Sequence, residues 1–276
     1  QGQVTEDIFL NPEARILEMN SKSGLYPLYM AYSLYAMKLP GPEDKLPLEQ
    51  TQALWQETVE QQIFVLCKTR MAESITRRTL VGYQDWTVNT TYIPHLLERM
   101  EKDPQRLAKK LQRTDTWGKE GQPMKFDAIV GNPPYQLETS GDSRQAVPIY
   151  DLFVNTAKLV EPHYLSMIMP SRWFAGGMGL DDFRNDMMHD HRIVKLVDYT
   201  NAKECFPQIS ISGGICYFLW DSKYDGMCNF ISIRNGDVHS SNRALDEFPI
   251  LVRYNEAISI LHKIAAKKES RFDEIV

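Results

Sequence analysis

The feature that most constrains the fold is an apolar run, Phe126–Val130, that leads into Asn132-Pro133-Pro134-Tyr135. A short apolar run of this kind is typical of a buried strand. Each proline fixes its own φ and lacks a backbone N–H, and the residue before a proline avoids the helical region. Neither a helix nor a regular strand continues through two prolines. The sequence therefore predicts a strand that ends at a rigid turn with free carbonyl oxygens.

This turn has the groups needed to activate a planar amino group. The side-chain oxygen of Asn132 and the carbonyl of Pro133 can each accept one amino hydrogen, which leaves the nitrogen lone pair free to attack an electrophilic carbon. Tyr135 offers a ring on which a flat base can stack. An ordinary loop turn is the alternative interpretation, because Asn-Pro and Pro-Pro are common in loops. The strand before the turn and the aromatic residue after it favour a catalytic turn over an ordinary loop.

The segment resembles the catalytic turn of N6-adenine DNA methyltransferases with the gamma-type order of motifs, found in type II and IIG restriction-modification enzymes. The resemblance implies transfer of a methyl group from S-adenosylmethionine to adenine N6, on a base flipped out of double-stranded DNA. It implies catalytic roles for Asn132, Pro133, Pro134 and Tyr135. It also implies an adenine-specific enzyme of a restriction-modification system, which in some members is fused to an endonuclease.

A second part of the family pattern concerns the flipped base. The loop Glu204–Gln208 holds Phe206 followed by a proline, at the position along the chain where the family has its Phe-Pro motif. By resemblance, Phe206 stacks on one face of the adenine and Tyr135 contributes from another side. Base flipping costs a few kcal/mol, and stacking offsets roughly 1–3 kcal/mol of it. Pro170–Phe174 resembles a further family motif that lines the site.

The cofactor side follows the family pattern less closely. An acid at the end of the first strand and a glycine-rich turn approach the methionine part of the cofactor in the family, and Glu18 and Gly24 stand at those places. The turn has Lys22 where the family has another glycine, and this lysine could instead reach the cofactor carboxylate. After the second strand, where the family has an acid for the ribose hydroxyls, this chain has Cys67-Lys68.

A later acidic-aromatic pair completes the expected cofactor site. Asp85 and Trp86 match the family's Asp-Phe pair, in which the carboxylate accepts from the adenine amino group of the cofactor and the ring packs on its base. Asn132 is also expected to border the cofactor. A turn acid beside a core tryptophan is the structural alternative for the pair.

The order of elements predicts an α/β fold. Apolar runs and helical spacings alternate along the chain, which favours a doubly wound, mostly parallel sheet. The resemblance implies seven strands, as in a Rossmann-like class I methyltransferase, and the short last connection favours a late antiparallel hairpin at one edge. The expected strands lie at Ala14–Met19, Ile63–Cys67, Leu80–Tyr83, Phe126–Val130, Tyr164–Met169, Ile193–Tyr199 and Gly213–Asp221, and the expected helices at Leu25–Leu39, Arg70–Thr79 and Tyr150–Leu159.

Composition adds broad limits. The 276 residues carry a net charge of −5 and are 43% hydrophobic, which is typical of a globular protein, and no run is long enough to span a membrane. A bacterial cytoplasmic protein with reduced cysteines is expected. The start at Gln1 suggests a fragment, 1–276 being the catalytic domain, with a DNA-recognition domain after residue 276 and a possible nuclease before residue 1. The acidic charge leaves Arg106–Arg113 as the local basic cluster, either a solvated helix face or a track for phosphates.

Other chemistries match the sequence poorly. His189, Asp190 and His191 lie together, but this spacing places the two imidazoles on opposed faces of a helix, so a solvated helix end is favoured over a metal site. No GxSxG turn and no P-loop is present. Two alternatives to DNA methylation remain. One is a methyltransferase-like DNA-binding scaffold that has lost cofactor chemistry, and the other is a protein glutamine methyltransferase.

Overall fold

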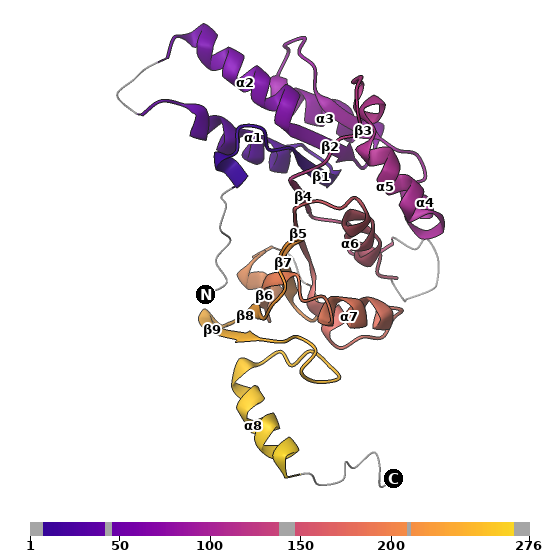
Figure 1. Cartoon of the computed structure of the whole chain (residues 1–276), viewed down its shortest axis with the longest axis vertical. Coiled ribbons are helices and arrows are strands. Elements are labelled where there is room, and N and C mark those ends of the chain that lie inside the picture. Colours follow the sequence, from indigo (N-terminus) through magenta and orange to yellow (C-terminus); the bar gives the residue numbers. More distant parts are fainter. Residues whose placement is uncertain (1–7, 42–45, 138–146, 209–210, 268–276) are drawn as a thin grey trace. The chain divides into compact units, whose positions relative to one another are not determined.

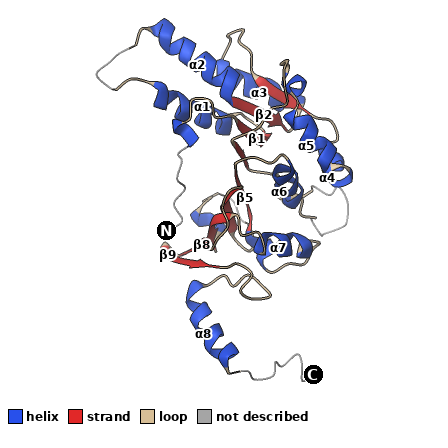
Figure 2. Ribbon diagram, viewed as in Figure 1, coloured by secondary structure: helices blue, strands red, loops and turns tan. Residues whose placement is uncertain are grey.

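The computed structural model describes residues 8–41, 46–137, 147–208 and 211–267. The chain divides into two compact units, Gln1–Met169 with Phe218–Tyr224, and Pro170–Tyr217 with Asp225–Val276. Figures 1 and 2 show the helices and strands of each. The elements in chain order are β1 Ile16–Ser21, α1 Leu25–Lys38, α2 Leu48–Gln62, β2 Ile63–Cys67, α3 Arg70–Val81, β3 Asn89–Tyr92, α4 Leu96–Lys102, α5 Pro104–Gln112, β4 Ala128–Gly131, α6 Tyr150–Leu159, β5 Tyr164–Pro170, α7 Asp181–Met188, β6 Ile193–Tyr199, β7 Ile215–Asp221, β8 Cys228–Arg234, β9 Asp237–Arg243 and α8 Asn255–Ala266.

The described residues form a mixed nine-stranded sheet with the order β3-β2-β1-β4-β5-β7-β6-β8-β9. β1 pairs in parallel with both β2 and β4, and β3 and β5 extend this parallel part on either side. The α/β class is therefore confirmed, whereas the expected count of seven strands is wrong. β8 and β9 are additional, and they form the antiparallel hairpin at the edge of the sheet. β6 and β7, which were expected there, lie inside the sheet.

Helices cover both faces of the parallel part in the first unit. Along β2, Ile63, Val65 and Cys67 belong to a buried cluster with residues of α1, α2 and α3. Phe64 faces the other way, and its ring lies 5.4 Å from the ring of Trp117, after α5. Alternate residues of a strand point to opposite faces, so an unbroken apolar strand indicates a sheet buried on both sides. β2 is therefore covered on both faces, as its apolar sequence predicts.

The predicted third strand is displaced in the structure. Leu80 and Val81 end α3, because Leu80 continues the buried helical stripe that Ala72 and Thr76 begin. The actual strand, β3, is short and polar, which hides it from a search for apolar runs. Asn89 shows why it is polar, since its buried side chain donates to the backbone carbonyls of Ile63 at 2.8 Å and Glu60 at 2.9 Å.

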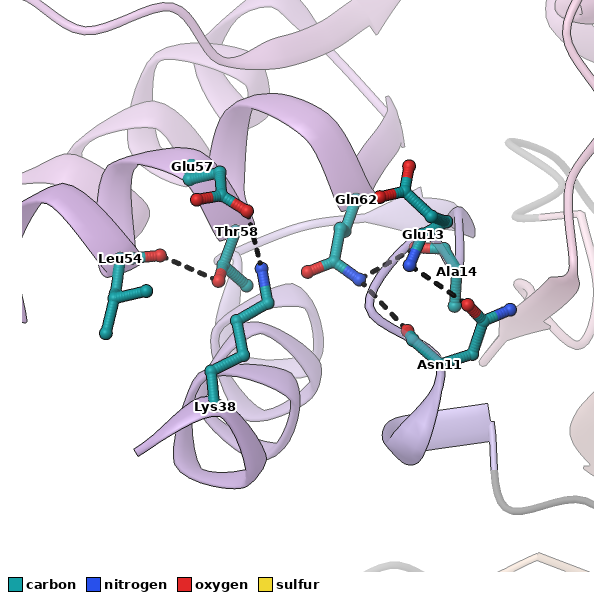
Figure 3. Close-up of polar contacts among 8 residues, drawn as sticks. All are labelled: Asn11, Glu13, Ala14, Lys38, Leu54, Glu57, Thr58 and Gln62. Atoms are coloured by element: carbon teal, nitrogen blue, oxygen red, sulfur yellow. Dashed lines mark hydrogen bonds and ion pairs between the residues drawn. The ribbon is translucent and has the colours of Figure 1, made fainter. Parts of the chain in front are cut away.

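Helix α2 was not expected, and polar contacts join it to its neighbours in the first unit (Figure 3). Its last residue, Gln62, is buried and donates to the backbone carbonyl of Ala14, 3.1 Å away, at the approach to β1. Lys38, the last residue of α1, forms an ion pair with Glu57 of α2 at 3.2 Å. The first contact joins the end of α2 to the residues before β1, and the second joins α1 to α2.

A truncation at Phe64 should lower stability strongly. Its ring is fully buried and meets both Trp117 and Phe126 edge to face. Phe64→Ala is expected to reduce the free energy of unfolding by about 3–5 kcal/mol, because apolar burial is removed and a cavity is left. Tyr29→Ala is the control, since that ring is 70% exposed and its removal should cost about 0.5 kcal/mol or less. Urea unfolding measures both, and equal effects would contradict the packing described.

Candidate active site

The Asn132 turn stands at the carboxyl end of β4, where parallel α/β sheets bind ligands. Gly131 precedes it and lies so close to β1 that an added Cβ would be 3.1 Å from the backbone oxygen of Met19. Pro133 is buried, and Asn132 and Tyr135 are half-buried. The backbone carbonyl of Tyr135 accepts from Ile149 at 3.4 Å, which anchors the far end of the turn.

The carboxyl end of β1 meets the Asn132 turn. Asn20 is buried and has a φ of 78°, a left-handed conformation that asparagine tolerates better than most residues. Its side-chain amide donates to the backbone carbonyl of Asn132 at 3.4 Å. The side-chain amide of Asn132 makes no hydrogen bond within the part of the chain that the structure describes. Its oxygen is therefore available to accept from a ligand.

Glu18 lies on β1 two residues before Asn20 and is the most unusual group of this region. Its side chain is 3% exposed, and its Oε2 has no hydrogen-bond partner among the described residues. Burial raises the pKa of Glu18 to about 7, although a hydrogen bond from Ser21 and the charge of Lys22 act in the opposite direction. A buried carboxyl group without a full set of partners is costly, so this position suits a donor or a cation from a ligand.

The packing of α1 against α3 requires a glycine at position 24. Its φ is +77°, and a Cβ there would lie 2.9 Å from the Cα of Thr76 on α3. The glycine is therefore needed for the close approach of α1 and α3, whether or not a ligand lies nearby. Lys22, which stands in place of the family's other glycine, is exposed and close enough to Glu18 to lower the pKa of that carboxyl.

The end of β2 places a thiol where the family has an acid. Cys67 is 1% exposed, and burial raises the pKa of its thiol to about 12, with smaller contributions from the charges of Glu73 and Glu18. A buried neutral thiol cannot hold the hydroxyls of a ribose. Glu73, in the first turn of α3 after the cap at Thr69, is near the same strand end and partly exposed. Burial also raises the pKa of Glu73, with Arg70 acting against it.

The structure does not bring Asp85 and Trp86 to this edge of the sheet. Both precede β3, so they lie at its amino end, whereas the turns after β1 and β4 are at the carboxyl ends. The Asp85 side chain is fully exposed and 3.5 Å from Arg77, and Trp86 packs against the buried cluster of α1, α2 and α3. This placement follows from the displaced third strand.

Two residues that sequence reasoning missed stand at the carboxyl ends of β2 and β3. Tyr92 is the last residue of β3, and the guanidinium carbon of Arg70 lies 5.5 Å from its ring centroid. The Thr69 cap marks Arg70 as the start of a helix directly after β2, whereas Tyr92 ends a polar strand that a search for apolar runs does not find. An aromatic ring and a cation at this edge are suited to a flat, polar ligand group.

Phe206 belongs to the second unit. It follows the 3₁₀ turn Ala202–Glu204, and its backbone N–H donates to Ala202 at 2.8 Å. Its side chain is half-buried rather than part of the core. The expectation that Pro170–Phe174 lines a site is not supported at two positions, because Trp173 and Phe174 are buried in the core of this unit.

Ser171 of the same segment has a different role. Its hydroxyl donates to the buried carboxylate of Asp198 at 2.6 Å. Arg253 donates to the same carboxylate from Nε at 2.5 Å and from Nη2 at 2.8 Å. Gly214 lies so close to Arg253 and to the carbonyl of Tyr199 that any side chain there would clash with both. This network holds together the two strand ends from which the loop that carries Phe206 departs.

The described residues contain no group of three or more His, Cys, Asp and Glu side chains arranged to hold a metal ion. His189 caps the end of α7, where its Nδ1 lies 2.9 Å from the carbonyl of Asn185, as expected for a solvated helix end. Within the described ranges, no helix has both the length and the apolar character to cross a bilayer. All four cysteines are free, and only Cys205 is not fully buried.

Residues 61–206, more than half of the chain, match the Eco57I restriction-modification methylase family. The chain belongs to this family. An uncharacterized adenine-specific methylase of Mycoplasma pneumoniae is 40% identical over 106 residues, which are 37% of this chain and 25% of that protein. The chain therefore spans about a quarter of the length of this relative.

Solved structures of restriction-modification enzymes share the fold. A nuclease-deletion mutant of the type ISP enzyme LlaGI, in complex with a DNA substrate mimic, matches 91% of this chain and 25% of its own, with a TM-score of 0.58 and 11% identity. The type IIL enzyme MmeI, in complex with DNA, matches 88% of this chain and 36% of its own, with a TM-score of 0.56 and 11% identity. A modification subunit of a putative type I restriction enzyme from Vibrio vulnificus matches 94% of this chain and 50% of its own, with a TM-score of 0.50 and 10% identity.

The raised pKa of Glu18 predicts a pH-dependent stability. Between pH 4.5 and about 7 the folded protein keeps a proton that the unfolded chain has released, so the contribution of Glu18 to stability falls as the pH rises through this window. Glu18→Gln should remove this dependence. Relative to that of the wild type, the free energy of unfolding of the variant should therefore rise by about 3 kcal/mol between pH 4.5 and pH 8. Urea titrations at several pH values test this. The exposed Glu13→Gln is the matched control, and parallel curves for both variants would contradict the assignment.

Proposed function

We propose that this protein transfers a methyl group from S-adenosylmethionine to the N6 amino group of adenine in DNA, as part of a bacterial restriction-modification system in the cytoplasm. One observation carries the proposal. The Asn132 turn, with its unengaged amide, lies at the carboxyl end of β4 and contacts Asn20 at the carboxyl end of β1, two residues after the buried, partly unpartnered carboxyl of Glu18. Membership of the Eco57I family supports a DNA substrate.

The substrate side depends on hydrogen-bond acceptors held in place. The Asn132 side-chain oxygen and the Pro133 carbonyl accept one hydrogen each from the adenine amino group, which directs its lone pair out of the plane of the ring. Pro133 and Pro134 have no N–H, so no backbone donor of theirs competes for these acceptors. Tyr135 and Phe206 supply stacking surfaces for the flipped base. No strong base is needed before transfer, since the amino proton can leave to water afterwards.

The residues at the carboxyl edge fit a charged nucleoside cofactor, which supplies an electrophilic methyl group on a positively charged sulfur. Glu18, as a carboxylate, would face the cationic methionine part, where its Oε2 lacks a protein partner. Lys22 would meet the cofactor carboxylate. Glu73 would accept from the ribose hydroxyls in place of Cys67, and Tyr92 with Arg70 would border the adenine. Asp85 and Trp86 have no part in this arrangement, because they lie at the other edge of the sheet.

Loss of the Asn132 amide should abolish methylation. Removing one preorganised polar group that binds the reacting atoms typically lowers kcat by about 10²–10³-fold, and Asn132→Ala is expected to reach at least that range. Asn155→Ala, an exposed asparagine of α6, is the matched control and should retain full activity. Transfer of a radiolabelled methyl group to DNA is the measurement. Retained activity in Asn132→Ala would refute the role of the turn.

Cofactor binding can be tested without DNA. Because a cation favours the ionised form of Glu18, binding of S-adenosylmethionine should release a proton near pH 7, seen in calorimetry as a dependence of the heat on the buffer. Glu18→Gln should bind more weakly and release no proton, whereas Glu13→Gln should behave as the wild type. Absence of binding to the wild type even at millimolar cofactor would instead favour the scaffold function.

A further inference from the structure

Helices α4 and α5 and the 3₁₀ turn after them line a surface groove of about 590 Å³ in the first unit. It shares no residue with the Asn132 turn or with the turns after β1 and β2. Six of its lining residues are basic, in a chain whose net charge is −5. They are Arg99, Lys102, Arg106, Lys109, Lys110 and Arg113.

The three acids of the groove are already engaged. Glu98 binds Lys102 at 2.8 Å. Asp103 caps α5 by accepting from the backbone N–H of Arg106 at 3.1 Å. Asp115 forms a bidentate ion pair with Arg113 and also lies near Lys110. Internal pairing therefore does not neutralise the groove.

Three cations remain without an ion pair in the described part of the chain. Arg106, Lys109 and Lys110 are exposed, while Leu107 and Leu111 of the same helix are buried. With Arg113, just beyond the last turn of α5, they occupy positions i, i+3, i+4 and i+7, which form one stripe about 10 Å long. Like charges at these spacings destabilise a helix by roughly 0.2–0.5 kcal/mol per pair. An anionic partner would relieve this repulsion, and the stripe offers it cations that no acid of the described chain engages.

We propose that this groove binds the phosphate backbone of DNA, and so supplies electrostatic affinity outside the catalytic turn. Successive nucleotides of one strand are about 3.4 Å apart along the duplex axis, so the stripe spans about three of them. Arginine matches phosphate oxygens with two parallel N–H groups, and lysines add point charges. The choice of DNA as the partner rests on the proposed function, whereas the charge of the groove does not.

The test compares two variants of the chain that remove the same charge. The groove variant is Arg106→Gln/Lys109→Gln/Lys110→Gln, which keeps good helix formers at all three positions. The control is Lys195→Gln/Lys263→Gln/Lys267→Gln, three exposed lysines of β6 and the α8 region outside the groove. Binding of a labelled DNA duplex is measured by fluorescence anisotropy over a series of salt concentrations, without cofactor. Circular dichroism confirms that both variants are folded.

The groove variant should bind more weakly by about tenfold or more at low salt. Its slope of log affinity against log salt should be shallower by about 0.9 for every phosphate that the variant no longer neutralises, hence by up to about 2.7, and the control should keep the wild-type slope. Equal slopes in the two variants, or no binding of duplex by the wild type, would overturn the proposal. Loss of binding to immobilised polyglutamate with unchanged DNA binding would also overturn it, by assigning the groove to an acidic protein.

This result is separable from the proposed function. A groove variant with reduced DNA affinity should still bind S-adenosylmethionine as the wild type does, since no groove residue lies in the cofactor region. If methyl transfer were absent in every variant while the salt slope still changed, the groove would stand and the methyltransferase proposal would fall.

Discussion

The parallel pairing of β1 with β4 is the constraint on which the candidate site depends. In this register Met19 lies beside Gly131, and the missing side chain of that glycine lets the two strands approach closely at the Met19 carbonyl. The chains leave the sheet side by side as a result, and Asn20 can donate to the Asn132 carbonyl. A side chain at residue 131 would separate the strands at the point where β1 meets the Asn132 turn. The prolines make the Asn132 turn rigid, and the pairing of β1 with β4 fixes where that turn starts.

The second unit depends on a different interaction, the buried carboxylate of Asp198. Ser171 and Arg253 both donate to it, and they come from segments that lie before and after the strands of this unit. Removing one partner of a buried ion pair costs about 3–5 kcal/mol, because the other charge is then left unpaired. Gly214 leaves room for the guanidinium beside the strand end. The polar network therefore joins the segments at the base of the Phe206 loop.

Much of the first unit could be predicted from sequence, because its strands are buried on both faces and read as apolar runs. β2 and α6 match their predicted bounds, and β6 of the second unit does as well. The exception was β3, which is polar because its first residue, Asn89, hydrogen-bonds to backbone carbonyls next to β2. The same displacement leaves Asp85 and Trp86, the pair expected to hold the cofactor adenine, at the amino end of β3, and places Tyr92 at its carboxyl end. Elements with an apolar pattern, such as β2 and α6, were thus predicted to the residue, whereas a strand with a polar sequence was placed too early in the chain.

The raised pKa of Glu18 explains how the protein tolerates a buried carboxyl group that has too few hydrogen-bond partners. An ionised carboxylate in this position would be costly, and the pKa raised to about 7 lets the group keep its proton over a wider pH range than an exposed glutamate does. The protein therefore avoids much of the desolvation cost when no cation is present. A positively charged ligand reverses the balance, since it stabilises the carboxylate and displaces the proton. The same burial that destabilises the ionised group makes its interaction with a cation stronger than it would be in water, so the low stability of this position and its capacity to bind have a single physical cause.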